Sequence, residues 1–450
     1  MTDLVVRSRR VVTPEGTRPA AVHVAGGRIV KVAAFDDVPA HPAPRTADLI
    51  LPGLVDTHVH VNEPGRTEWE GFETATRAAA AGGVTTLLDM PLNSVPATTS
   101  VEALREKRAA AAGRTWVDVG FIGGVVPGNA GSLRALAEAG VRAFKCFLVP
   151  SGVEEFEHVG ERELREAMPS LASLGLPLMV HAELPGPIER VYPTLAGKDP
   201  RRYATYLASR PPAAETEAIE MMVRLCESTG ARTHIVHVSS AESVPILSAA
   251  RAGGVPLTAE TCPHYLALDA SGIEDGATEF KCAPPIRDRT NRDALWEALV
   301  RGDLDMIVSD HSPCPPSLKR GGSGDFLAAW GGIASLQLGP SVVWSEMQQR
   351  GLPIGCLVRW MSEAPARLVG LDQIKGRIAP GYDADLVLWD PDGQQTVDPG
   401  MLHCRHPITP YAGRQLTGVV EATYVRGQLA YDRRSGPATR PVGRLLWRRV

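Results

Sequence analysis

The segment DTHVHVNEPGRTEWEGF, which spans Asp56–Phe72, decides the fold of this chain. It starts inside the apolar run GLVDTHVHV and places two histidines, His58 and His60, one residue apart. Alternate side chains of a β-strand point to the same face, so both imidazoles face one side of the predicted strand. This spacing indicates a pair of metal ligands at the end of a buried strand.

Seven further short apolar runs follow the first one, and segments with helical periodicity separate most of them. The eight predicted strands are residues 53–61, 83–90, 117–126, 141–149, 176–183, 232–240, 255–260 and 304–310. Runs this apolar are typical of strands buried on both faces of a parallel sheet. Eight such βα units predict an α/β fold, a (β/α)8 barrel of the TIM type. An open, doubly wound sheet is the alternative, but no glycine-rich phosphate loop follows the first strand.

Two of the helices between these strands have recognisable ends. Thr67 and Glu70 predict a capping box before the helical segment that Gly82–Gly83 terminates. The segment AAETEAIEMMVRLCESTG has apolar residues at helical intervals and is predicted to end at Gly230.

Both ends of the chain have the pattern of β-structure. Gly26–Gly27 lies between two alternating apolar runs, which predicts a tight hairpin with positive φ in its turn. Similar strands reappear only in residues 382–390 and 422–432. We therefore predict a small composite β-sandwich built from residues 1–50 and 371–450, with the barrel in residues 51–370.

Composition excludes several classes of protein. The chain has 450 residues and a net charge of −4, and no basic stripe indicates nucleic-acid binding. Its seven cysteines are scattered and never spaced C-x-x-C, which argues against both a disulfide framework and a thiolate zinc site. No signal peptide or membrane span is evident, so a reduced, soluble, cytoplasmic protein is expected. The basic C-terminal GRLLWRRV is expected to be a solvated tail.

Candidate metal ligands lie on or at the ends of five predicted strands. They are His58, His60, Lys145, His181, His237 and Asp310. The carboxyl ends of barrel strands meet at one mouth, so these residues are predicted to converge. Imidazole and carboxylate ligands without thiolate favour Zn²⁺, with Mn, Fe or Co as lesser candidates. Five such ligands exceed the three of a mononuclear hydrolytic zinc, which favours two divalent metal ions.

Lys145 allows two interpretations. An ordinary ammonium would repel two divalent ions, so the lysine either points elsewhere, paired to a carboxylate, or is neutral. A neutral amine could capture CO₂ as a carbamate, whose two anionic oxygens would suit a bridge between two metals.

Motifs along nearly the whole chain resemble the cyclic amidohydrolase family, and within it most closely the allantoinases. They include TTLLDMPLNSVPATT, FKCFLVPSGVEEFEHV, VHAEL, HIVHVSSAESV, AETCPHYL, KCAPPIRD, SDHSPC and GRIAPGYDADLVLWDP. The resemblance implies a (β/α)8 barrel with a flanking β-sandwich, a binuclear metal centre and a homotetramer. It also implies that His58, His60 and Asp310 hold one metal, that His181 and His237 hold the other, and that a carboxylated Lys145 bridges them. His234 is the weaker choice of ligand, and His264 is expected to be structural.

Asn62 bears on the substrate. Dihydroorotases resemble this sequence but have arginine at this position, where a guanidinium suits a ring carboxylate. Asn62 suits a neutral cyclic ureide such as allantoin, and Asn93 is a second candidate for substrate contact. If dihydroorotate were the substrate, another cation such as Arg66 or Arg287 would have to replace the missing arginine. Asp310 is expected to act as the base that moves a proton from attacking water to the departing ring nitrogen.

Two related enzyme classes, one loop and a non-catalytic role stay open from the sequence. Hydantoinases and dihydropyrimidinases also accept neutral rings, but similar proteins have a tyrosine shortly after the bridging lysine, and this chain reads KCFLVPSG.

The segment KRGGSGDFLAAWGGI (Lys319–Ile333) is either a mobile lid or a plain loop. A non-catalytic scaffold role is conceivable for such a fold, although all six ligand positions are filled.

Overall fold

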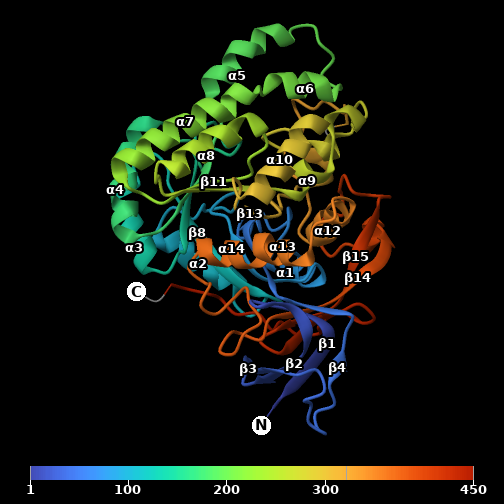
Figure 1. The fold of residues 1–450 in the computed structure, drawn as a ribbon. Coiled ribbons are helices and arrows are strands. Elements are labelled where there is room, and N and C mark those ends of the chain that lie inside the picture. The colour runs from blue at the N-terminus through green and yellow to red at the C-terminus, as the bar shows by residue number, and fades with distance from the viewer. Residues whose placement is uncertain (1, 321, 449–450) are drawn as a thin grey trace.

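Eight parallel strands form the centre of the computed structural model, which describes residues 2–320 and 322–448 (Figure 1). Each strand pairs with the next one along the chain. They are β6 (Leu54–Val59), β7 (Val84–Asp89), β8 (Asp118–Gly124), β9 (Ala143–Phe147), β10 (Leu178–His181), β11 (Thr233–Ile235), β12 (Leu257–Thr261) and β13 (Met306–Ile307). Every one of them overlaps a run that the sequence predicts to be a strand.

A backbone contact between the first and last of these strands closes the sheet. The His60 N–H donates to the His311 carbonyl oxygen over 2.8 Å, and Val59 and His311 form a parallel bridge. A barrel requires these two edges to be neighbours, whereas an open doubly wound sheet keeps them apart. The predicted (β/α)8 barrel is therefore confirmed.

Helices connect the strands and cover the outside of the barrel (Figure 1). The longer ones are α1 (Phe72–Ala81), α2 (Val101–Ala111), α4 (Glu161–Leu174), α7 (Pro212–Thr229), α8 (Val244–Ala252), α10 (Arg289–Arg301) and α12 (Gly339–Gln349). The shorter ones are α3 (Leu133–Glu138), α5 (Pro185–Val191), α6 (Tyr203–Ser209), α9 (Pro263–Ala267), α11 (Pro316–Arg320), α13 (Ile354–Val358) and α14 (Ala364–Leu368). Within the described ranges, no helix has both the length and the hydropathy to cross a membrane.

The two predicted helix ends are confirmed, but the capping box predicted at the start of α1 is wrong. Helix α7 ends at Gly230, whose φ of 67° is a left-handed conformation that glycine adopts without strain. Helix α1 ends at Gly82, but its start is capped by Glu63, which accepts a 2.8 Å hydrogen bond from the Phe72 N–H. Glu70 instead accepts from the Arg405 N–H, so it forms no capping box with Thr67.

Strands from both termini form a second sheet beside the barrel, blue and red in Figure 1. It contains β1 (Leu4–Thr13), β2 (Gly16–Ala25), β3 (Arg28–Ala33), β4 (Arg45–Thr46), β5 (Leu49–Pro52), β14 (Leu386–Thr396), β15 (Gln415–Val425), β16 (Gln428–Asp432) and β17 (Gly436–Pro437). Strand β5 pairs with β1 and with β14, which joins the two termini. Gly26 and Gly27, with φ of 56° and 80°, form the predicted turn between β2 and β3. The composite β-domain is thus present, and its nine strands form one connected sheet.

The described part of the C-terminal segment, residues 443–448, is not a solvated tail. The Leu446 N–H donates to the Val119 carbonyl oxygen of β8 over 2.7 Å, and the Arg108 guanidinium lies 4.2 Å from the centre of the Trp447 ring. Backbone hydrogen bonding to a barrel strand and an Arg–Trp contact hold this segment against the barrel.

A buried lysine, Lys375, joins the barrel to the terminal sheet. Its ammonium lies 2.6 Å from Asp118, 3.0 Å from Asp383 and 2.7 Å from Asp385, and Arg426 also pairs with Asp118. Burial acts against the charged form, but the carboxylates hold the pKa of Lys375 above its ordinary value. The three aspartates are close enough to hold a cation. Lys375 and Arg426, together with Arg28 at 3.7 Å from Asp383, supply one positive charge for each of the three carboxylates, so we interpret the group as an ion-pair cluster.

Replacing Lys375 by methionine is expected to lower the free energy of unfolding by about 3–5 kcal/mol, since one partner of a buried ion pair is removed. Denaturation in guanidinium chloride, followed by circular dichroism, measures this change. The control is Lys31→Met, which removes an exposed ammonium paired with Asp37 and should barely shift the midpoint. Equal shifts in the two variants would contradict a stabilising role for the buried cluster.

Candidate functional site

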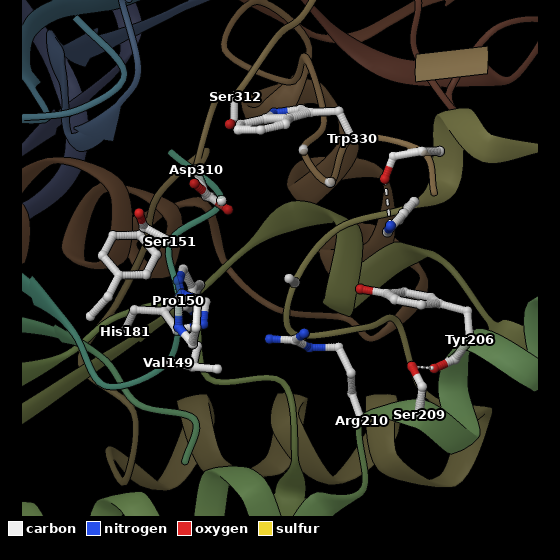
Figure 2. A pocket seen from close by; sticks show the side chains of 18 of the residues that line it. Val149, Pro150, Ser151, His181, Tyr206, Ser209, Arg210, Asp310, Ser312 and Trp330 are labelled. Carbon is white, nitrogen blue, oxygen red and sulfur yellow. Dashed lines mark hydrogen bonds between the residues drawn. The ribbon is translucent and has the colours of Figure 1, made fainter. Parts of the chain in front are cut away.

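Five of the six predicted ligands line one cavity at the carboxyl ends of the barrel strands, and the sixth, Lys145, is buried and not part of the lining. The cavity has a volume of about 540 Å³. Its lining includes His58, His60, His181, His237 and Asp310. Figure 2 shows His181 and Asp310 on one side of this cavity and Arg210 and Tyr206 on the other. The barrel therefore brings together residues that are up to 252 positions apart in the chain (310 − 58).

Three of these residues form a compact group of potential metal ligands. Asp310 Oδ1 lies 3.3 Å from His58 Nε2 and 3.7 Å from His60 Nε2. One ligand atom from each of the three residues lies within 4.8 Å of the others, which is close enough to share one ion.

His181 and His237 form a second group next to the first. Their ring centres are 4.6 Å apart, and the His237 ring centre lies 5.4 Å from that of His58. The His181 ring also stacks on Phe147, with 4.6 Å between the ring centres. Two adjacent groups of imidazoles are the arrangement that two neighbouring metal ions need.

Hydrogen bonds fix the orientation of three of the histidines. His58 Nδ1–H donates to Glu260 over 2.6 Å, His60 Nδ1–H donates to the Leu92 carbonyl over 3.1 Å, and His181 Nε2–H donates to Glu183 over 2.8 Å. In each ring the other nitrogen is left for the cavity. A metal-binding histidine usually has its second nitrogen held in this way.

His234 lies behind the site rather than on the cavity surface. Its Nε2–H donates to Glu260 over 2.9 Å, and its Nδ1 lies 2.7 Å from the Thr258 hydroxyl. Glu260 thus connects His234 to His58, and both nitrogens of His234 are occupied by protein groups. His264 is also buried outside the cavity lining.

The amine of Lys145 is buried without a partner. Lys145 Nζ has no hydrogen bond to any described residue, and the same holds for His237 Nδ1. Burial lowers the pKa of Lys145 to about 8, although the Asp310 and Glu260 carboxylates oppose this shift. An amine in this state is more easily neutralised than an ordinary lysine, and it lacks the carboxylate partner that one of the two interpretations required.

Two site residues adopt an unusual backbone conformation. His237 and Asp310 have φ of 40° and 36°, which is the left-handed region that side chains other than glycine rarely adopt. Such strain costs on the order of 1–3 kcal/mol per residue and is concentrated at functional sites. Both residues closely follow barrel strands, where the turn aims the side chain into the cavity.

Comparison with known proteins agrees with this geometry. The model of the amidohydrolase family matches residues 49–430. An allantoinase of Streptomyces avermitilis is 51% identical over 449 residues, which is 99% of each chain. An allantoinase of Saccharomyces cerevisiae is 46% identical over 401 residues, 88% of this chain and 86% of that protein. A solved L-hydantoinase (dihydropyrimidinase) from Arthrobacter aurescens has a TM-score of 0.94 and 30% identity, covering 100% of both chains.

The chain belongs to the amidohydrolase family. Its relatives and its family make it an enzyme, a hydrolase of cyclic amides. The family and the hydantoinase structures also imply a binuclear site for divalent metal ions.

The residues present fit such a site. Burial, together with the charge of Lys145, holds the pKa of His58 well below its usual range, and burial lowers the pKa of His60 to about 3. Both imidazoles are therefore neutral, which is the form that binds metal. The partnerless Lys145 Nζ and His237 Nδ1 are buried polar atoms that a bound group would satisfy.

The two asparagines take different positions. Asn93 lines the cavity, whereas Asn62 is fully buried and is not part of the lining. Asn62 Oδ1 accepts a 3.0 Å hydrogen bond from Asn93 Nδ2, and Asn62 Nδ2 donates weakly to the Pro313 carbonyl over 3.4 Å. Asn62 therefore holds Asn93 in place.

Two cations at the cavity were not anticipated from the sequence. Arg210 and Lys281 line it, whereas Arg66 and Arg287 do not; these two pair with Glu155 and Glu215. Arg210 pairs with Glu183, the carboxylate that accepts from His181. The carboxylates that hold the histidines could have been found from the sequence, because Glu183 and Glu260 lie at the ends of predicted strands.

Replacing Glu260 by glutamine is expected to weaken metal binding by about 10- to 100-fold, because His58 loses the carboxylate that orients it. Competition with a chromophoric chelator measures the affinity of the purified protein for Zn²⁺. Glu274→Gln, on an exposed residue away from the site, is the matched control. If both variants bind Zn²⁺ as tightly as the wild type, Glu260 does not act on the metal site.

Proposed function

We propose that the enzyme opens the hydantoin ring of allantoin to give allantoate, as part of purine catabolism. The observation that carries this proposal is the 51% identity to an allantoinase over 449 residues. Allantoinases of Arabidopsis thaliana and of Salmonella choleraesuis, at 44% and 37% identity, extend the agreement to plants and to other bacteria. In this reaction water adds to a ring amide carbon and the bond from that carbon to the ring nitrogen breaks, so the carbon becomes a carboxylate and the nitrogen stays in the product as part of a ureido group.

We propose two Zn²⁺ ions as the metals, with Mn, Fe or Co as lesser candidates. His58, His60 and Asp310 would hold one ion, and His181 and His237 the other. When bound, such ions polarise a carbonyl group and lower the pKa of water toward neutrality. The protein's own part is to present neutral imidazoles with fixed ring orientation.

Lys145 would bridge the two ions as N6-carboxylysine. Support comes from the buried, partnerless amine, whose charge lowers the pKa of histidines in both ligand groups, and from its own lowered pKa. Addition of CO₂ to the neutral amine forms an N–C bond and releases one proton, which yields the anionic carbamate.

Asp310 would be the catalytic base. Its carboxylate lines the cavity, 3.3 Å from His58 Nε2 and 3.7 Å from His60 Nε2. From there it can take a proton from the attacking water and return it to the departing ring nitrogen. A single carboxylate can perform both transfers because the ring nitrogen leaves from the carbon that the water attacks.

The polar groups around Asn93 favour a neutral ring. Asn93 lines the cavity and has one amide N–H committed to Asn62, so its amide oxygen and second N–H are free for a ring amide. Arg66 and Arg287 cannot serve as carboxylate ligands there, since both are paired outside the lining. Arg210 lines the cavity, but Glu183 neutralises it. These pairings disfavour the ring carboxylate of dihydroorotate.

Hydantoinase activity is the second candidate, and solved hydantoinases of similar fold favour it, among them a D-hydantoinase with a TM-score of 0.90 at 28% identity. The segment after Lys145 places Pro150 and Ser151, rather than a tyrosine, at the cavity. The Ser151 hydroxyl donates to the Phe156 carbonyl over 2.6 Å, so it is not a free substitute for a phenol. A homotetramer and a cytoplasmic location stay predictions from the sequence.

A turnover assay on protein reconstituted with Zn²⁺ and bicarbonate tests the substrate. We expect kcat/KM for allantoin to exceed that for dihydroorotate by about 100-fold or more, because a ring carboxylate would have to compete with Glu183 for Arg210 or with two carbonyl oxygens for Lys281. Hydantoin and dihydrouracil complete the panel. Preference for dihydroorotate would refute the neutral-ring proposal. Turnover of hydantoin or dihydrouracil alone would make the enzyme a hydantoinase.

Carboxylation of Lys145 can be observed directly. Metal-reconstituted protein incubated with ¹³C-labelled bicarbonate is expected to show one carbamate carbon resonance per chain in its NMR spectrum. Lys145→Met should lose the resonance, whereas Lys281→Met, at another buried lysine, should keep it. A resonance that survives in Lys145→Met would show that a different amine is modified.

A further inference from the structure

One wall of the cavity is a stretch of backbone with few polar side chains. Residues 327–332 (Leu-Ala-Ala-Trp-Gly-Gly) all line the cavity. Apart from the indole of Trp330, which Figure 2 shows at the cavity, the wall offers a substrate only its shape and its peptide groups. Its contribution to binding therefore depends on how this backbone is held.

Lys319 holds the wall from behind. Its ammonium donates to the carbonyl oxygens of Lys281, Trp330 and Gly332 over 2.7, 3.1 and 2.5 Å. An ammonium has three N–H donors, so all of them are used. Lys319 is buried, with 4% of its surface exposed, and all three of its N–H donors bond to backbone carbonyl oxygens.

Lys281 continues the same arrangement on the cavity side. Its ammonium donates to the Leu327 carbonyl over 3.1 Å and to the Ala329 carbonyl. Together the two lysines bind four of the six carbonyl groups in 327–332. The Lys281 carbonyl also accepts from the Gly332 N–H over 2.8 Å, which ties the wall to the loop after β12.

Hydrogen bonds to backbone, rather than to carboxylates, accompany the burial of both lysines. In the part of the chain that the structure describes, the two ammonium groups donate only to carbonyl oxygens. Burial lowers the pKa of each lysine to about 8. Carbonyl oxygens carry partial negative charge, and here they take the place of a hydrogen-bonded carboxylate in stabilising the two cations.

The orientation of the carbonyl groups determines which peptide N–H groups of the wall point toward the cavity. In a planar trans peptide the N–H points opposite to the C=O. Turning the Trp330 carbonyl to Lys319 therefore turns the Gly331 N–H to the other side, and this N–H has no backbone partner among the described residues. Losing the ammonium would free these peptide units to rotate.

We propose that Lys281 and Lys319 are positioning residues that fix the 327–332 wall against the substrate, which rests on the proposed function of this cavity. The wall is then a preformed surface, anchored at its carbonyls. Whether Lys319–Ile333 is a mobile lid or a plain loop stays untested, and its Gly321 lies outside the described residues.

The test measures the zinc-loaded enzymes Lys281→Met and Lys319→Met with allantoin. Methionine keeps most of the length of the side chain but removes the donors. We expect KM to rise about 10- to 100-fold in each variant, which corresponds to losing one or two hydrogen bonds from a charged donor, while kcat changes far less. Metal content should equal that of the wild type. Hydrogen exchange should become faster in peptides covering 325–333 and stay unchanged in the barrel strands.

Three controls separate positioning from a general loss of stability. Lys198→Met removes an exposed lysine outside the cavity and should leave kcat and KM unchanged. Lys319→Arg keeps a cationic donor and should recover part of the loss. Because Lys281 lines the cavity, ethylammonium in solution should lower the KM of Lys281→Ala, whereas tetramethylammonium, which has no N–H, should not. This last pair also tests the proposal if Lys319→Met fails to fold.

Unchanged KM and unchanged exchange in both methionine variants would overturn the proposal. The proposal would also be overturned if both methionine variants lost kcat, bound metal and overall protection from hydrogen exchange in parallel, and ethylammonium did not lower the KM of Lys281→Ala. That combination would indicate a folding defect. If the wild type does not hydrolyse allantoin, the proposed function fails, but the exchange measurements need no substrate and still decide the role of the lysines.

Discussion

Closure of the barrel between its first and last strands is the constraint on which the site depends. The His60 N–H and the His311 carbonyl form the hydrogen bond that joins these edges. That contact brings Asp310 to within 3.3 Å of His58, although the two residues come from opposite ends of the barrel sequence. Without closure, His58 and His60 from the first strand could not share a metal ion with Asp310 from the last strand. The neighbouring structure that holds the backbone of Asp310 in its left-handed conformation would also be missing.

Burial of charge shapes the surroundings of the ligands. Each carboxylate behind the metal site has a defined partner: Glu183 pairs with Arg210 and accepts from His181, and Glu260 accepts from His58 and His234. Lys145 has no such partner among the described residues. A buried ionisable group without a partner is costly, and Lys145 therefore differs from the paired carboxylates around it. A bound group that gave the amine a partner would remove this cost.

Two cations that line the cavity, Arg210 and Lys281, are paired with a carboxylate or bonded to backbone carbonyl oxygens. Arg210 is held by Glu183, and Lys281 is held by the Leu327 and Ala329 carbonyls. The cavity is therefore polar without offering Arg210 as a free guanidinium to an anionic ring. This arrangement agrees with a neutral cyclic ureide, and Asn93 and the backbone wall line the cavity whereas Asn62 does not.

The sequence by itself determined the eight strands, the composite β-domain and the convergence of five of the six candidate ligands on one cavity. It could do so because strand periodicity and the direction of parallel strands are local rules that hold whatever lies beside them. Only the tertiary structure decided that Asn62 holds Asn93, that Glu63 replaces the predicted capping box, and that the C-terminal segment packs on β8. It alone also paired Arg210 with Glu183, placed Lys319 behind the wall and placed Lys281 on the cavity side of it. These contacts join side chains to groups distant in the chain, and their geometry is set by packing that no short sequence pattern encodes.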